Sequence, residues 1–159
     1  MNNNEFYTVR GYQLLKQNKK LLTPALEDYL EMIYRISLQE KYTRMNTLAA
    51  LLNVKPSSAT KMVQKLSHLN LVDYQKYEGI SLTAQGSEIG EFLYKRHRII
   101  ETFLELLALS KDVHMETELI EHHISPYTLE NLNLLNQYLE QNPSIIEDFQ
   151  KLKDSFLKK

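Results

Sequence analysis

Two groups of acidic and histidine side chains are spaced so that each could contribute ligands to a metal cation. Asp28 and Glu31 are three residues apart, so on a helix they would be neighbours on its surface. Glu118, Glu121 and His122 have the spacing i, i+3, i+4, which places two carboxylates and an imidazole on one helical face. Such a set of oxygen and nitrogen ligands suits a divalent cation.

A third candidate is His97, which lies in an apolar stripe. It shares the helical spacing i, i+4, i+7, i+11 with Leu93, Ile100 and Leu104. Its imidazole is therefore expected to be buried, where the ring nitrogens need partners. A hydrogen-bonded core histidine and a metal ligand both meet that need.

The other two groups also have ordinary interpretations, because exposed helix surfaces often carry acids. The pair at 28 and 31 fits a solvated acidic edge, and the cluster at 118–122 fits a polar face. If all three groups converge, four carboxylates bring four negative charges to one place. Two divalent cations would balance these charges, whereas one would balance only half of them. The sequence therefore predicts a two-metal site, on the condition that the groups meet.

The elements that must position these residues are mostly helices. Thr23 and Pro24 suit the N-cap and first position of a helix that runs to about residue 38. Thr83 is expected to cap a long helix over about 84–108, which carries His97. Two further helices are expected over about 115–123 and 127–142, and a short last helix after Pro143.

Between the first and the long helix, the pattern is typical of a winged helix-turn-helix. A short helix over about 45–52 and a turn at 53–55 precede a helix that begins at Pro56. Alternating residues at 71–74 and 80–82, on either side of a glycine, predict a two-stranded hairpin. The inward stripe of the helix at Pro56 is Ala59, Met62, Val63 and Leu66.

The outward face of that helix suits DNA, because it offers short polar and amide groups for bases and lysines for phosphates. An amphipathic helix with an ordinary solvated face is the alternative. The candidate DNA contacts on the helix are Ser57, Ser58, Thr60, Lys61, Gln64 and Lys65. Lys76 and Tyr77 lie where the tip of the hairpin would reach the backbone or the minor groove.

Composition sets further bounds on the function. The net charge is only −1, but residues 53–71 contain lysines and no acids, and residues 112–121 contain acids and no lysine or arginine. The chain has no cysteine, which excludes disulfides, thiolate zinc sites and cysteine nucleophiles. We see no signal peptide and no apolar run of membrane length, so we expect a cytoplasmic protein.

Several segments resemble the diphtheria-toxin-repressor, or iron-dependent repressor, family. The run from Val54 to Leu66 resembles the family's recognition helix, and 23–31, Arg96-His97 and 118–123 resemble its first helix, linker helix and second ligand cluster. The resemblance covers about residues 23–142. It implies that the metal ligands are Asp28, Glu31, His97, Glu118, Glu121 and His122.

Two departures from the iron-type members favour the manganese branch of the family. Those members carry a methionine where this chain has Asp28 and a cysteine where it has Glu118. They usually also carry a third, SH3-like domain, for which this chain is too short. A ligand set of carboxylates and imidazoles also suits Mn²⁺.

We therefore expect a mainly α fold, in which a long helix joins a winged helix-turn-helix domain to an all-helical dimerisation domain. The expected division is an N-terminal arm at 1–22, the DNA-binding domain at 23–83, the linker helix with the metal-binding and dimerisation domain at 84–142, and a C-terminal helix at 143–159. Apolar residues near the end of the long helix lie on more than one of its faces, so one face is expected to pack within the subunit and the other to meet a second subunit. These residues are Phe103, Leu104, Leu106, Leu107 and Leu109.

The expected function is a manganese-responsive repressor that binds a palindromic operator as a metal-loaded homodimer and controls metal-uptake genes. We expect two Mn²⁺ ions per subunit and no enzymatic activity. One alternative is a carboxylate-bridged di-metal oxidase or hydrolase on a helical scaffold. Another is a DNA-binding protein that responds to an organic ligand, with its acids merely solvated.

Overall fold

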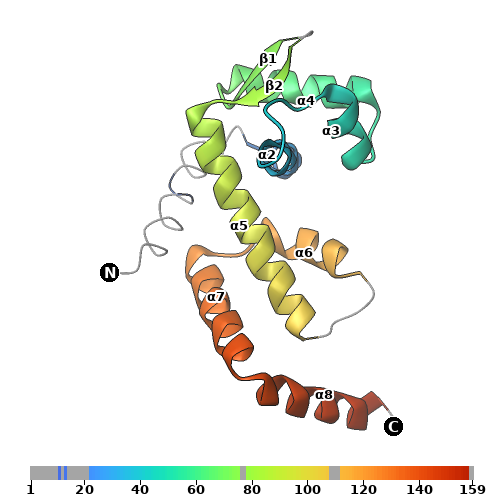
Figure 1. Ribbon diagram of the computed structural model, residues 1–159, viewed down its shortest axis with the longest axis vertical. Helices are drawn as coiled ribbons and strands as arrows, with labels where there is room; N and C mark the ends of the chain where they lie inside the picture. Colours follow the sequence, from blue (N-terminus) through green and yellow to red (C-terminus); the bar gives the residue numbers. More distant parts are fainter. Residues whose placement is uncertain (1–10, 12, 14–21, 76–77, 108–111, 158–159) are drawn as a thin grey trace. The chain divides into compact units, whose positions relative to one another are not determined.

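The structure is a computed structural model that describes residues 11, 13, 22–75, 78–107 and 112–157. It divides into two compact units between Tyr94 and Lys95, and each unit is described by itself. The division lies inside the helix α5 (Ala84–Leu106), so this helix contributes to both units (Figure 1).

Between residues 22 and 94, the described part of the first unit contains three complete helices, a hairpin and the start of α5. The helices are α2 (Pro24–Ser37), α3 (Met45–Leu51) and α4 (Pro56–His68), and the strands are β1 (Val72–Gln75) and β2 (Gly79–Leu82). The predicted winged helix-turn-helix pattern is confirmed, and the described residues are mainly helical with a small two-stranded sheet (Figure 1).

The helix α2 begins where the sequence predicts, although its capping differs from expectation. Thr23 is the N-cap residue, but its side chain makes no capping hydrogen bond. Its backbone carbonyl instead accepts from the amides of Leu26 at 2.8 Å and Glu27 at 3.0 Å. Pro24 at the first helical position therefore provides the clearer local signal.

The turn between α3 and α4 determines how α4 is oriented relative to α3. Asn53 adopts a left-handed conformation with φ of 51°, which asparagine tolerates better than most residues. The amide of Val54 then donates to the carbonyl of Ala49 at 2.9 Å, which closes the turn. The apolar stripe of α4 faces the core: Ala59, Val63 and Leu66 are fully buried, and Met62 is half-buried.

The hairpin is antiparallel, with Val72 opposite Leu82 and Gln75 opposite Gly79. Thr43 adds an isolated bridge to Ile80, in which each amide donates to the carbonyl of the other residue. The two residues predicted for the hairpin tip, Lys76 and Tyr77, lie outside the described residues.

Two contacts hold the start of α5 against the rest of the first unit. The Thr83 hydroxyl accepts from the Gly86 amide at 3.0 Å, so the predicted cap is present. A Cβ atom at Gly86 would lie 1.7 Å from the carbonyl oxygen of Leu71, so only glycine fits there. The helix therefore begins directly against the base of the hairpin.

The second unit contains the rest of α5 with α6 (Val113–Glu121), α7 (Pro126–Gln141) and α8 (Pro143–Leu157). The Ser125 side chain caps α7 by accepting from the amide of Thr128 at 3.2 Å. The last helix has 15 residues, so the expectation of a short one was wrong. None of the described helices is long and apolar enough to cross a membrane.

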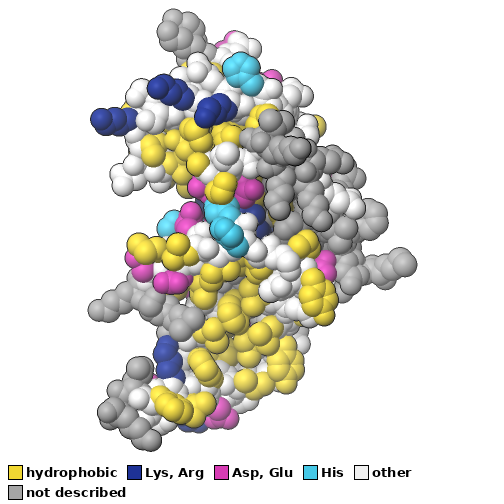
Figure 2. All heavy atoms as spheres, turned by 180° about the vertical axis from the view of Figure 1, so that it is seen from behind, with side chains coloured by type: hydrophobic (Ala, Val, Ile, Leu, Met, Phe, Trp, Pro, Cys, Tyr) yellow, Lys and Arg dark blue, Asp and Glu magenta, His cyan; other side chains and the backbone are white. Residues whose placement is uncertain are grey.

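The second unit leaves many large apolar side chains exposed, and Figure 2 shows them gathered over its surface. Of the apolar residues near the end of α5 that were expected to pack within the subunit or to meet a second one, Leu104 is buried, three are half-buried, and Leu109 lies outside the described residues. Further exposed apolar surface is supplied by α6, α7 and α8. Its members are Met115, Leu119, Ile120, Tyr127, Leu134, Leu135, Tyr138, Ile145, Phe149, Leu152 and Phe156.

Candidate metal centre and nucleic-acid interface

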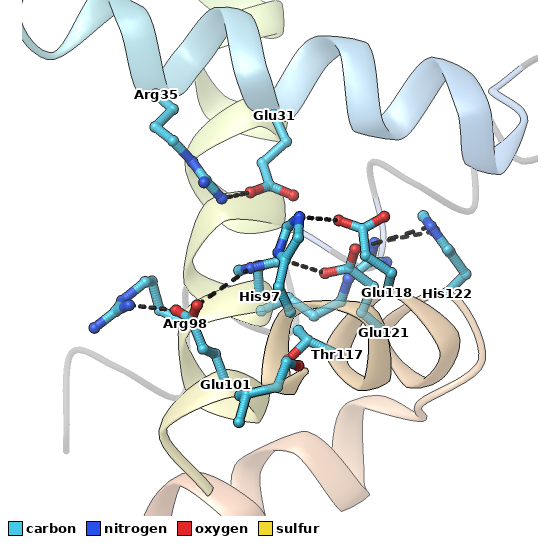
Figure 3. Close-up of polar contacts among 12 residues, drawn as sticks. Glu31, Arg35, His97, Arg98, Glu101, Thr117, Glu118, Glu121 and His122 are labelled. Carbon is cyan, nitrogen blue, oxygen red and sulfur yellow. Dashed lines mark hydrogen bonds and ion pairs between the residues drawn. The ribbon is translucent and has the colours of Figure 1, made fainter. Parts of the chain in front are cut away.

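A buried pair of a histidine and a glutamate joins α5 to α6 in the second unit (Figure 3). His97 Nδ1 lies 3.1 Å from Glu121 Oε2, and both residues are only 1% exposed. Since a carboxylate can only accept, Nδ1 must carry the hydrogen. In the neutral ring the lone pair is then on Nε2, the atom that can bind a cation. A carboxylate that orients a histidine in this way is common behind metal-ligating imidazoles.

The surroundings of the second oxygen of Glu121 indicate whether these residues could bind a metal. Glu121 Oε1 is buried and accepts no hydrogen bond from the described residues. His122 Nε2 lies 3.9 Å from this oxygen, too far for a hydrogen bond. Burying a carboxylate oxygen without a partner is unfavourable, and binding of a cation would offset that cost. The residues present therefore fit a divalent metal.

The other predicted ligands of this unit lie close to Glu121. One ligand atom from each of Glu118, Glu121 and His122 lies within 4.8 Å of the others. Arg96, which is 3% exposed, places its Nη2 atom 3.3 Å from His122 Nδ1. Because a guanidinium can only donate, Nδ1 of His122 is the acceptor in this arrangement.

Two further residues of the second unit were missed by the sequence analysis. Glu101 and His114 form a group with His97 whose ligand atoms all lie within 4.8 Å of one another. The rings of His97 and His114 are 5.4 Å apart, and Glu101 Oε1 lies 4.0 Å from His97 Nε2. The spacing i, i+4 between His97 and Glu101 was the available signal. His97 thus belongs to two groups of candidate ligands.

The remaining two predicted ligands lie on α2 in the first unit. Asp28 is half-buried, and Glu31 is 6% exposed, so Glu31 does not belong to a solvated edge. Glu31 Oε1 accepts from Arg35 Nη2 at 2.5 Å. Because the α2 pair and the other four residues belong to different units, the meeting of all six stays a prediction.

An aromatic pair lies beside this ion pair in the first unit. The rings of Tyr34 and Tyr94 are 6.0 Å apart, and the Arg35 guanidinium carbon is 5.7 Å from the centre of the Tyr94 ring. Burial raises the pKa of Tyr34 above its ordinary value, with smaller contributions from Glu91 and Tyr94. The Tyr34 phenol therefore stays neutral at physiological pH.

The predicted DNA-facing side of α4 is turned away from the core. Ser57, Ser58, Lys61, Gln64 and Lys65 are exposed, which agrees with their expected role. The exception is Thr60, which is half-buried and whose hydroxyl donates to the carbonyl of Pro56 at 2.9 Å. That hydrogen bond leaves the hydroxyl with acceptor capacity only.

Two family descriptions together match most of the chain. The description "Iron dependent repressor, N-terminal DNA binding domain" matches residues 21–80. The description "Iron dependent repressor, metal binding and dimerisation domain" matches residues 83–150. The boundary between the two matches lies at the start of α5.

Individual relatives agree with these matches. The chain is 40% identical to the HTH-type transcriptional regulator MntR of Oceanobacillus iheyensis, over 82% of this chain and 89% of that protein. The manganese regulator SloR is a similar solved structure, with a TM-score of 0.62 and 34% identity over 71% of this chain. The metal-dependent transcriptional regulator MtsR has a TM-score of 0.64 and 30% identity over 73% of this chain.

The matched part spans only about half of those two solved chains, 54% of SloR and 55% of MtsR. It spans nearly the whole of the relative from Oceanobacillus iheyensis. The family consists of transcriptional repressors, which argues against the alternative of a di-metal enzyme. The order of the two domain matches and this extended identity show that the chain is a member of the iron-dependent repressor family.

Proposed function

We propose that this chain is a manganese-responsive transcriptional repressor that binds operator DNA as a metal-loaded homodimer and controls metal-uptake genes. Family membership, and relatives whose names describe manganese regulators, support the proposal. The observation that carries it is the buried Glu121 carboxylate, which is hydrogen-bonded to His97 on one oxygen and lacks a described donor on the other. The protein would act in the cytoplasm, where its operator is.

The proposed ligands come from both units. The set is Asp28, Glu31, His97, Glu118, Glu121 and His122. Mn²⁺ would supply positive charge that offsets the mutual repulsion of the four carboxylates. Two ions per subunit would balance that charge, and this stoichiometry is part of the proposal.

The proposed DNA contacts are the exposed face of α4 and the tip of the hairpin. Lysines would bind phosphates, while serine, threonine and glutamine side chains would reach base edges. Two copies related by a twofold axis would read a palindromic operator. The residues proposed are Ser57, Ser58, Thr60, Lys61, Gln64, Lys65, Lys76 and Tyr77.

The distribution of the ligands suggests how metal and DNA binding are coupled. Asp28 and Glu31 belong to the first unit and His97 to the second. Ligands drawn from both units would restrict the movement of one unit relative to the other, and so favour one spacing of the two α4 helices in a dimer. A preference of about 2–3 kcal/mol for that state would raise DNA affinity roughly 30- to 150-fold.

The double variant Glu118→Gln, Glu121→Gln tests the proposal. It removes two carboxylate charges with little change of shape, so it should keep the helical content and lose Mn²⁺-dependent operator binding. The measurement is a gel-shift titration against DNA from upstream of metal-transporter genes, with and without Mn²⁺, together with circular dichroism. A double variant that responds to Mn²⁺ like wild type contradicts the proposal.

A matched control is Glu105→Gln, Glu116→Gln. These two glutamates lie on α5 and α6, the helices that carry the proposed ligands, and both are exposed. The control removes the same charge from the second unit without touching a candidate ligand. It should therefore keep its response to Mn²⁺.

A further inference from the structure

The proposed ligand Glu31 has a cationic partner within its own helix. Arg35 is one turn further along α2 and donates from Nη2 to Glu31 Oε1 at 2.5 Å (Figure 3). The Glu31 side chain is 8% exposed and that of Arg35 is 36% exposed. The contact is therefore a charge-assisted hydrogen bond to a carboxylate that has lost most of its water.

Packing on the other side keeps the guanidinium in this position. It lies 5.7 Å from the centre of the Tyr94 ring, a distance at which a cation is attracted to the ring face. Tyr34 packs against Tyr94, and a Cβ atom at Gly90 would lie only 2.7 Å from Tyr34 Cβ. The close approach of α2 and α5 thus leaves Arg35 between a carboxylate and an aromatic ring. A chance ion pair on an open surface lacks such support.

We propose that Arg35 is a resident competitor of the metal, and that it sets the Mn²⁺ concentration at which Glu31 becomes a ligand. This inference rests on the proposed function. A guanidinium that is hydrogen-bonded to Glu31 partly neutralises the carboxylate that a metal needs. It also places a positive charge close to any cation bound there, and like charges repel. Arg35 therefore weakens metal binding and stabilises the metal-free protein.

A purely structural role makes a different prediction. An i, i+4 pair stabilises a helix slightly whatever the carboxylate binds. Removing Arg35 would then lower the stability of the protein and leave its Mn²⁺ affinity unchanged. Competition instead requires the two quantities to move in opposite directions, with lower metal-free stability and higher affinity.

The test compares Arg35→Met, Arg35→Gln and Arg35→Lys with wild type, without DNA. Methionine removes the positive charge but keeps apolar contact with the Tyr94 ring. Glutamine replaces the guanidinium with a neutral polar group, and lysine keeps the positive charge. Mn²⁺ affinity is measured from the electron paramagnetic resonance signal of the free ion, and the melting temperature is measured without metal. We expect the methionine and glutamine variants to bind Mn²⁺ about tenfold more tightly than wild type. The effect is moderate because the Arg35 charge is partly exposed, so solvent screens its repulsion of the metal without abolishing it. Both should melt at a lower temperature, and the lysine variant should stay close to wild type.

The matched control is Lys151→Met on α8. Lys151 donates to Asp148 at 3.0 Å, three residues away, and both side chains are more than 70% exposed. This variant removes one charge of a helical pair that has no candidate ligand, so its Mn²⁺ affinity should equal that of wild type.

Glu31→Gln separates this inference from the proposed function. If Glu31→Gln binds Mn²⁺ like wild type, the ligand assignment is wrong and the role of Arg35 falls with it. If Glu31→Gln weakens binding but the two neutral Arg35 variants bind no more tightly than wild type, only the competitor role is overturned. A lysine variant as tight as the methionine variant would also overturn it, since charge would not be the cause.

Discussion

The hydrogen bond between His97 and Glu121 determines what each side chain offers to a ligand. It puts the ring hydrogen on Nδ1 of His97 and leaves the lone pair on Nε2. It also uses only one oxygen of Glu121, while the other accepts no hydrogen bond from the described part of the chain. The same side chains can therefore be a hydrogen-bonded core pair and still offer the second oxygen of Glu121 and Nε2 of His97 to a metal. In the sequence, a core histidine and a metal ligand were alternative interpretations of His97, and the structure is compatible with both.

Replacing His97 with asparagine should weaken Mn²⁺ binding at least tenfold. Asparagine can still donate a hydrogen bond to Glu121, but its amide is a poorer ligand than an imidazole. His97 also belongs to the group with Glu101 and His114, so its loss would affect both sets of candidate ligands. Equilibrium dialysis against Mn²⁺ measures the change.

The control for this variant is His123→Asn, because His123 is exposed and belongs to no candidate group among the described residues. That variant should bind Mn²⁺ like wild type. Equal affinities for His97→Asn and His123→Asn would remove His97 from the site.

At the scale of elements, α4 combines a fully apolar inner stripe with an outer face that carries no acid. Ala59, Val63 and Leu66 anchor the helix, so changes on the outer face should not unfold it. Substitutions on the outer face can therefore be used to test DNA binding without disturbing the packing of the core.

Lys61→Ala and Gln64→Ala should each weaken operator binding while the melting temperature stays near that of wild type. Loss of a lysine that contacts phosphate should also lower the salt dependence of binding by about one unit. Fluorescence anisotropy with labelled operator, repeated at several salt concentrations, measures both effects. Lys151→Ala on α8 is the control, and normal binding by both α4 variants would show that this face does not contact DNA.

Local signals predicted most of the elements. The cap at Thr83, the proline at the start of α4 and the alternation of the hairpin depend on neighbouring residues, and all three appear in the structure. The side chain of Thr23 did not cap as expected, because capping depends on a rotamer that the sequence does not fix.

The candidate site was harder to predict from the sequence than the fold. His114 was missed because only the packing of α6 on α5 brings it to His97. Arg35 was missed because its pairing with Glu31 looks like any surface i, i+4 pair until burial is known. The burial of Glu31 itself could not be inferred from a helical spacing that fits a solvated edge equally well.

At the scale of the whole molecule, the second unit exposes many large apolar side chains on α6, α7 and α8. Leu134 and Tyr138 are one turn apart on α7 and are 60% and 54% exposed. Contiguous apolar surface of this kind is typical of a subunit interface. A single winged helix also covers little DNA, which independently favours a dimer.

The double variant Leu134→Glu, Tyr138→Glu should therefore sediment as a monomer at micromolar concentration, whereas wild type should sediment as a dimer. Two buried negative charges at an interface cost more than the apolar contacts they replace. The control is Leu38→Glu, at a residue that is 55% exposed and lies in the first unit. A wild-type monomer, or a dimer of the double variant, would contradict this assignment.

The position of the boundary inside α5 limits how the length of the chain can vary. The two units meet within one continuous helix, between Tyr94 and Lys95, and no loop is present there to absorb an added residue. One inserted residue would turn everything after it by about 100° about the helix axis and advance it by about 1.5 Å. The part of the stripe formed by His97, Ile100 and Leu104 would then no longer line up with Leu93, although no residue had been substituted. Insertions and deletions should therefore accumulate in the connections between helices, while natural variants and engineered chimeras keep the length of α5 unchanged.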